Sequence, residues 1–184
     1  MYYKCIIIIK LLLVLNIGIY AQLTKIKGVQ MVSLGFGFTK YSTVTNIGYN
    51  YFLSKDMCIG DELNFEFGKV KLSNYFDFDN NEVFKYNLYS FQFNKVLHYQ
   101  LNENLKSYYS INLIQTAGFG YEYIYNDKKN SHLNGMRYNI GFGFSNNLTI
   151  KNYEIGLRME EKYMINSLLG KFYWVVMPEV KYLF

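Results

Sequence analysis

The chain has 184 residues, of which 51% are hydrophobic and 18% are charged. This length suits one domain, and the apolar content excludes a solvated disordered chain. With 20 tyrosines and 15 phenylalanines against one tryptophan and one proline, the composition favours pleated, half-buried surfaces and membrane–water interfaces.

The N-terminal segment predicts an export signal, residues 1–21, followed by a single domain over residues 22–184. Lys4 supplies the positive charge, an apolar stretch follows, and the small Ala21 precedes the expected cut. The alternative is a membrane anchor, but Lys10 interrupts the stretch and leaves it too short to span easily. Without Lys4 and Lys10 the net charge falls to +3, which is too small to indicate nucleic-acid binding.

Apolar and polar residues alternate with a period of two through the rest of the chain, as in β-strands. The alternation recurs in eight segments: 32–39, 46–53, 62–68, 89–94, 109–123, 138–145, 153–160 and 174–184. An even number of strands, with eight as the smallest common size, is typical of transmembrane barrels.

The two faces of these segments differ in size as well as polarity. In 138–145 one face carries Tyr, Ile and two Phe, and the other carries Asn, Ser and two Gly. Small polar residues suit the inside of a narrow barrel, and lipid accommodates the aromatic face. A soluble lipocalin-type barrel is the alternative, but its small interior would be crowded by these aromatics. We therefore predict an all-β fold, an eight-stranded antiparallel transmembrane β-barrel in a bacterial outer membrane.

The connections alternate in length. We expect short periplasmic turns at 54–56, 102–104 and 151–152, and longer outer loops at 71–83, 126–136 and 165–171, with a short first outer turn near Tyr41. The single proline, Pro178, falls on the lipid-facing register of the last segment. It predicts a bulge or a local gap in the ladder, because proline has no N–H to donate.

Charged residues gather on the predicted inward face. They can form either a salt-bridge network that fills the lumen, which we favour, or a proton relay or catalytic carboxylate pair. Eight strands leave room inside only for side chains, and buried charges need partners. The predicted network consists of Glu62, Glu66, Glu122, Arg158, Glu160, Glu179 and Lys181.

His98 and His132 are the only histidines, and a histidine paired with a serine could indicate a membrane enzyme. We expect His98 near the periplasmic end of its strand and His132 in an outer loop, too far apart to share a site. Neither has metal-ligand spacing around it, and Cys58 is the one cysteine of the predicted mature chain. We therefore expect no catalytic residues, no metal, no cofactor and no small-molecule substrate.

Two further patterns have simple structural interpretations. Gly118-Phe119-Gly120 and Gly141-Phe142-Gly143 lie inside strands rather than before a helix, so they indicate relief of crowding and not a phosphate loop. Tyrosines near strand ends favour interfacial girdles over a sugar-binding platform. They include Tyr49, Tyr51, Tyr121, Tyr123 and Tyr125.

Several short motifs resemble the TraO family of conjugative transfer proteins from Bacteroidetes. They are Lys27-Gly28, Ala117 to Glu122, Tyr138 to Gly143, Leu148-Thr149 and the aromatic-ended strand after Pro178. The chain departs from the family near its end, where it reads Glu179 to Phe184 in place of the family's glycine, leucine, arginine and aromatic. The resemblance implies a non-enzymatic outer-membrane component of a DNA-transfer apparatus.

These expectations leave three hypotheses for function. The first is a structural or interaction protein that contacts outer-membrane lipid and other transfer-apparatus proteins, without direct contact with nucleic acid. The second is a membrane enzyme acting on lipid or peptide, and the third is a surface adhesin or ligand binder.

Overall fold

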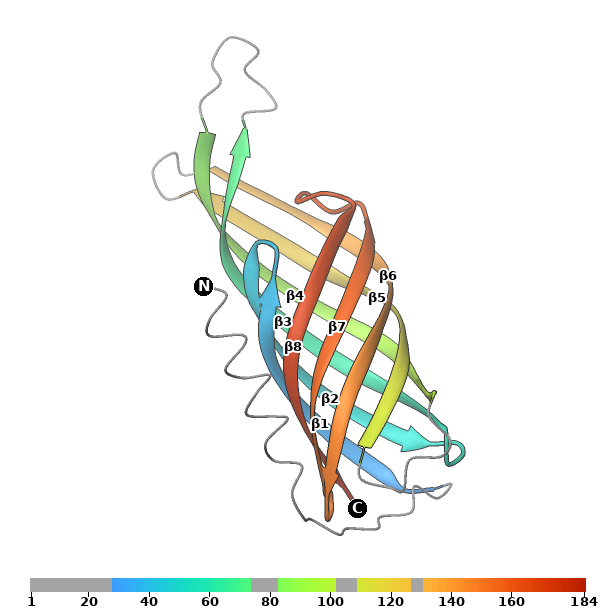
Figure 1. Ribbon diagram of the computed structural model, residues 1–184. Helices are drawn as coiled ribbons and strands as arrows, with labels where there is room; N and C mark the ends of the chain where they lie inside the picture. The colour runs from blue at the N-terminus through green and yellow to red at the C-terminus, as the bar shows by residue number, and fades with distance from the viewer. Residues whose placement is uncertain (1–27, 74–82, 102–108, 127–130) are drawn as a thin grey trace.

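A computed structural model describes residues 28–73, 83–101, 109–126 and 131–184, so the predicted signal, residues 1–21, lies outside the described residues. The described chain forms a closed antiparallel barrel in which consecutive strands pair and the last pairs with the first (Figure 1). The predicted fold class is confirmed. In chain order the strands are β1 (Gln30–Thr39), β2 (Ser42–Phe52), β3 (Met57–Ser73), β4 (Val83–Gln100), β5 (Tyr109–Asn126), β6 (Ser131–Ile150), β7 (Tyr153–Ile165) and β8 (Phe172–Leu183).

The pleat of each strand sends alternate residues to opposite sides of the wall. On β6, Phe142 and Phe144 are 58% and 54% exposed, whereas Ser145 is fully buried. Apolar side chains therefore face outward and polar ones inward, which excludes the lipocalin-type alternative. In the described part of the chain, no helix is long and apolar enough to cross a membrane.

Every predicted segment falls on one strand to within one residue, but the strands extend further than the alternation indicates. The predicted outer loop at 126–136 is wrong, because β5 and β6 remain paired up to Asn126 and Ser131. Likewise β3 and β4 remain paired up to Ser73 and Val83, so the connection between them spans only residues 74–82. In the extensions of β3 and β4 the alternation is reversed, because Lys69 and Lys85 are exposed whereas Val70 and Tyr86 are buried.

The barrel wall is uneven in height. Strands β3 to β6 have 17 to 20 residues, whereas β1, β2, β7 and β8 have 10 to 13. Figure 1 shows β3 and β4 rising well beyond the turn between β1 and β2. We call the upper parts of β3 to β6 the projecting wall, and the end of the barrel that carries it the upper end. The C-terminus lies at the lower end.

Pro178 interrupts the seam where the barrel closes. The β1–β8 ladder pairs Gly35 with Glu179 and then resumes at Phe38 with Val176, so the pairs at Pro178 and its neighbour are missing. The register is the same on both sides of this interruption, as expected for a local gap and not for a bulge.

Candidate functional site

All seven residues of the predicted lumen network point into the barrel, and each is at most 4% exposed. Strands β3, β5, β7 and β8 supply them, because in each strand these positions share the inward side of the pleat. Their side chains gather around two arginines, one of which was not part of the predicted set. Burial makes both arginines dependent on their carboxylate partners.

Arg158 on β7 is the centre of the first group. Its Nη1 lies 2.7 Å from an oxygen of Glu62 on β3 and 3.2 Å from one of Glu179 on β8. Its Nη2 lies 2.7 Å from an oxygen of Glu160 on the same strand. A guanidinium offers five N–H donors in a fixed fork, so one side chain connects three strands across the lumen.

Lysines and neutral groups complete this first group. Lys181 contacts Glu179 at 3.2 Å, and Lys162 lies 3.9 Å from Glu160. Asn46 donates a hydrogen bond to Glu62, and Thr116 donates one to Glu160. The carboxylates are thus held by β2 and β5 as well, so the group spans most of the circumference of the barrel.

Arg137 on β6 is the centre of the second group, nearer the upper end. It pairs with Glu66 on β3 at 2.6 Å and with Glu122 on β5, and it donates a hydrogen bond to Ser90 on β4. The ring of Tyr173 on β8 lies 6.0 Å from the guanidinium carbon. This second group connects the tall side of the barrel with the short side.

Arg137, Lys162 and Glu154 also belong to the buried charged set, although the predicted network did not include them. Arg137 precedes a predicted segment by one residue and Lys162 follows another by two, so extending the alternation would have placed both inside. Glu154 lay on the predicted inward face but was left out of the network. The buried set comprises six glutamates, two arginines and two lysines.

Apolar side chains close the lumen at both ends. Met31, Phe52, Cys58 and Leu183 pack together at the lower end. At the upper end Val70, Tyr86, Leu88 and Ile124 form a second cluster, against which Tyr41 and Leu169 pack. Three small cavities, one near each end and one between them, have volumes of about 10 Å³ each, close to the minimum for one water molecule. The described lumen is therefore filled with side chains and provides no open channel.

The connection between β7 and β8, residues 166–171, folds over the upper end. Ser167 Oγ and the backbone N–H of Leu168 donate hydrogen bonds to Glu122 at 2.8 and 2.9 Å. Gly170 has a φ of +120°, a conformation that favours glycine and permits the chain to return to β8. We call this segment the cap.

The two histidines do not share a site. His98 is buried on the inward side of β4, two residues from the lower end of that strand. His132 lies on the exposed upper end of β6, where it stacks on Tyr123, and not in a loop as predicted. Within the described ranges, no group of three or more His, Cys, Asp and Glu residues could hold a metal ion.

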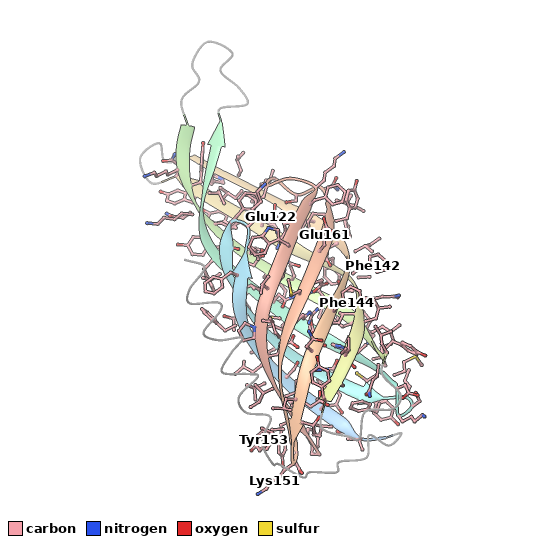
Figure 2. The ribbon with its side chains drawn as sticks, in the orientation of Figure 1. Glu122, Phe142, Phe144, Lys151, Tyr153 and Glu161 are labelled. Carbon is pink, nitrogen blue, oxygen red and sulfur yellow. The ribbon has the colours of Figure 1, made fainter. Side chains whose placement is uncertain are left out.

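Aromatic side chains lie on the outer wall near both ends of the barrel. Tyr123 stacks on Tyr125 near the upper end. Near the lower end Tyr182 packs against Tyr153 and Phe184. Figure 2 shows Tyr153 at the lower end of the barrel, far below Phe142. This distribution is typical of the aromatic girdles that flank an apolar membrane band.

No family model matches the chain, and no curated protein matches it. Solved structures do match. The attachment invasion locus protein Ail of Yersinia pestis is 15% identical, with a TM-score of 0.54, over 86% of this chain and 100% of that one. The N-terminal β-barrel domain of Pseudomonas aeruginosa OprF is 14% identical, with a TM-score of 0.54, over 86% and 98%. A major outer membrane protein from Thermus thermophilus is 8% identical, with a TM-score of 0.68, over 85% and 99%.

These likenesses establish the fold, and the outer wall establishes its setting. A closed barrel with a polar, filled interior and a mainly apolar exterior satisfies its backbone hydrogen bonds internally and presents mainly apolar surface to lipid. This protein is therefore an eight-stranded β-barrel of a bacterial outer membrane.

Proposed function

We propose that this protein is a non-enzymatic interaction component of the outer membrane, and that its projecting wall binds a protein partner. The filled lumen supports this proposal, because cavities of about 10 Å³ leave no path for a solute. Binding surfaces must then lie at the rims and on the outer wall. The projecting wall is the largest departure from an even barrel.

The observation that carries the proposal is the pair of open edges on the projecting wall. The β2–β3 ladder ends at Gly68, so no strand of the described chain lies beside Lys69–Ser73 of β3 on that side. The β6–β7 ladder begins at Tyr138, which leaves Ser131–Arg137 of β6 open in the same way. Open edges present backbone N–H and C=O groups to which an extended segment of a partner can pair.

The open β6 edge also carries exposed apolar side chains. Leu133 and Met136 are 38% and 53% exposed, and both lie above the part of β6 that pairs with β7. Side chains of this kind add apolar contact to backbone pairing, which favours an extended peptide of alternating character as the partner segment.

We further propose that the partner belongs to a conjugative transfer apparatus, on the basis of the resemblance to the TraO family. Deletion of the gene should lower the frequency of conjugal transfer from donor cells, and the wild-type gene should restore it. Transfer at the wild-type frequency would refute the conjugation role.

Edge binding can be tested separately from conjugation. Changing Leu133 and Met136 to lysine should abolish capture of the partner, since charged residues protect open edges from pairing. The matched control changes Asn152, in the turn between β6 and β7 at the opposite end of the barrel, to lysine. Capture of the same partner by the edge variant would refute edge binding, whatever the partner's identity.

Polyanion binding at the upper end is a second candidate function. Lys40, Lys69, Lys85 and Lys171 are exposed and lie at or near this end of the barrel. Ail has been solved in complex with the heparin analogue sucrose octasulfate. Sucrose octasulfate should bind vesicles containing this protein and should bind less when the four lysines are changed to glutamine. Equal binding by the quadruple variant would exclude this function.

A further inference from the structure

The outer wall carries a carboxylate inside its apolar band. Glu161 on β7 points outward, with Phe142 and Trp174 as its ladder partners on the two adjacent strands. Along its own strand the next outward residues are Met159 and Tyr163. Figure 2 shows Glu161 in the upper part of β7, near Phe142 on β6. A charged group facing lipid at this depth is costly and indicates a function or a partner.

The surface around Glu161 is hollowed. Large side chains splay apart and leave a groove of about 880 Å³ that opens outward. Its walls include Phe142, Phe144, Met159, Phe172 and Trp174. Among the described residues, no basic side chain forms an ion pair with Glu161. The groove is thus mainly apolar, with a carboxylate that has no cationic partner among the described residues.

The same chain presents a matching cation on another part of its outer wall. Lys95 on β4 points outward and donates to both carboxylate oxygens of Asp61 on β3, at 2.8 and 3.0 Å. An ammonium has three N–H donors, and two are engaged here. Within the described ranges the third has no acceptor. In an apolar setting it therefore lacks a partner, as Glu161 does.

Lys95 and Glu161 also lie at similar depths. A single row of ladder partners runs from Val32, near the lower end of β1, through Lys95 and Tyr163 to Phe172 at the upper end of β8. The row therefore rises between Lys95 and Tyr163, and Glu161 lies two residues below Tyr163. For strands tilted by about 40°, the remaining difference in depth is on the order of 4 Å, which a lysine side chain spans.

From these observations we propose that the Glu161 groove binds the Lys95 wall of a second copy of this chain. Strands β3–β4 and β6–β8 lie on different sides of the barrel, so the contact joins unlike surfaces. Each copy then has one groove and one lysine to offer, and two barrels in contact leave one of each unused. Contacts of this kind continue from copy to copy and produce curved rows or closed rings of barrels in the membrane plane.

Cysteine cross-linking in membranes tests this contact while both charges stay in place. The variant carries Leu97→Cys, two residues from Lys95, and Met159→Cys, two residues from Glu161. With a short bismaleimide it should produce a ladder of dimers, trimers and larger species. Either single-cysteine variant should produce no ladder. Glu161→Gln in the double-cysteine background should reduce the ladder about tenfold.

A charge-reversed variant distinguishes loss of the contact from misfolding of Glu161→Gln. With Asp61→Lys, Lys95→Glu and Glu161→Lys combined, every proposed pair is present with opposite sign, and the ladder should return. Heat-modifiable mobility checks that each barrel is folded. The matched control, Lys151→Gln in the lower turn, should leave the ladder unchanged.

Four outcomes would overturn the proposal. They are absence of a ladder in the double-cysteine variant, an undiminished ladder in folded Glu161→Gln, dimers alone from Met159→Cys, and cross-links to a different protein. The third would indicate two Glu161 grooves facing each other, and the fourth a partner other than this chain.

Discussion

Arg158 shows how a single side chain can organise the inside of a small barrel. It reaches carboxylates on β3, β7 and β8, and it is 1% exposed. Neither the arginine nor the carboxylates can exchange their partners for water at this depth. The contribution of each ion pair to stability therefore depends on the others. Loss of Arg158 should leave all three glutamates without this cation.

We expect Arg158→Met to lower the free energy of unfolding by about 3 to 5 kcal/mol, because it leaves buried carboxylates without their cation. Urea titration of the barrel in detergent micelles, followed by heat-modifiable mobility, measures this loss. Lys69→Met is the control, since Lys69 is exposed and its replacement should change stability by less than about 0.5 kcal/mol.

A second variant separates the lost ion pairs from the lost side-chain volume. Arg158→Met combined with Glu160→Gln removes one of the stranded charges, so it should be more stable than Arg158→Met alone. If the double variant is less stable by the sum of the two single effects, the arginine and the glutamate are not coupled in this way.

At the scale of single residues, alternation in the sequence was enough to place the buried glutamates on the inward face of the barrel. It could not show which charges meet, because Arg158 and Glu62 lie 96 positions apart and only barrel closure brings them together. It also missed Arg137, which lies where the apolar alternation fades at the edge of the membrane band. There the outward residues no longer face lipid, so they need not be apolar and the alternation of apolar and polar residues becomes hard to recognise.

Among the elements, the cap is held by contacts that can be separated experimentally. Its polar side hydrogen-bonds to Glu122, while Leu169 packs on the upper apolar cluster. The adjacent Leu168 is 37% exposed. Two neighbouring leucines in one short segment thus differ mainly in burial.

We expect Leu169→Ser to loosen the cap, because the hydroxyl replaces an apolar contact with the buried cluster at the upper end. Hydrogen exchange of the backbone amides in residues 166–171 should become faster, most clearly at Leu168, whose N–H is bonded to Glu122. Leu168→Ser should leave the exchange of its neighbours nearly unchanged. Equal acceleration in both variants would show that packing by Leu169 does not hold the cap.

The strands could be predicted where contact with lipid on one side makes apolar and polar residues alternate. All eight strands were found, together with the gap at Pro178. The projecting wall was not found, because its residues above the membrane band meet water on one or both sides. On β3 and β4 the polar residues there face outward and the apolar ones inward, the reverse of the membrane band, and residues 131–136 of β6 resemble a loop in sequence.

In the whole molecule the usual arrangement of a soluble protein is reversed: polar side chains lie inside and apolar side chains lie outside. Its charged residues are gathered in the centre, apolar side chains close the two ends of the lumen, and aromatics cover the outside. Closure of the barrel satisfies the backbone, and the ion pairs satisfy the interior. What remains for contact with other molecules is the projecting wall, the cap and the outer groove at Glu161.

The filled lumen predicts that the protein does not conduct ions. In a planar lipid bilayer the wild-type barrel should give no steady current, because cavities of about 10 Å³ cannot form a continuous water path. Changing Arg158, Glu62 and Glu160 together to alanine removes three large side chains from the centre and should permit current. The control changes the outward Leu34, Ile47 and Phe142 to alanine and should remain silent. A steady wild-type current, or silence of the folded inner variant, would show that the charged centre is not what closes the barrel.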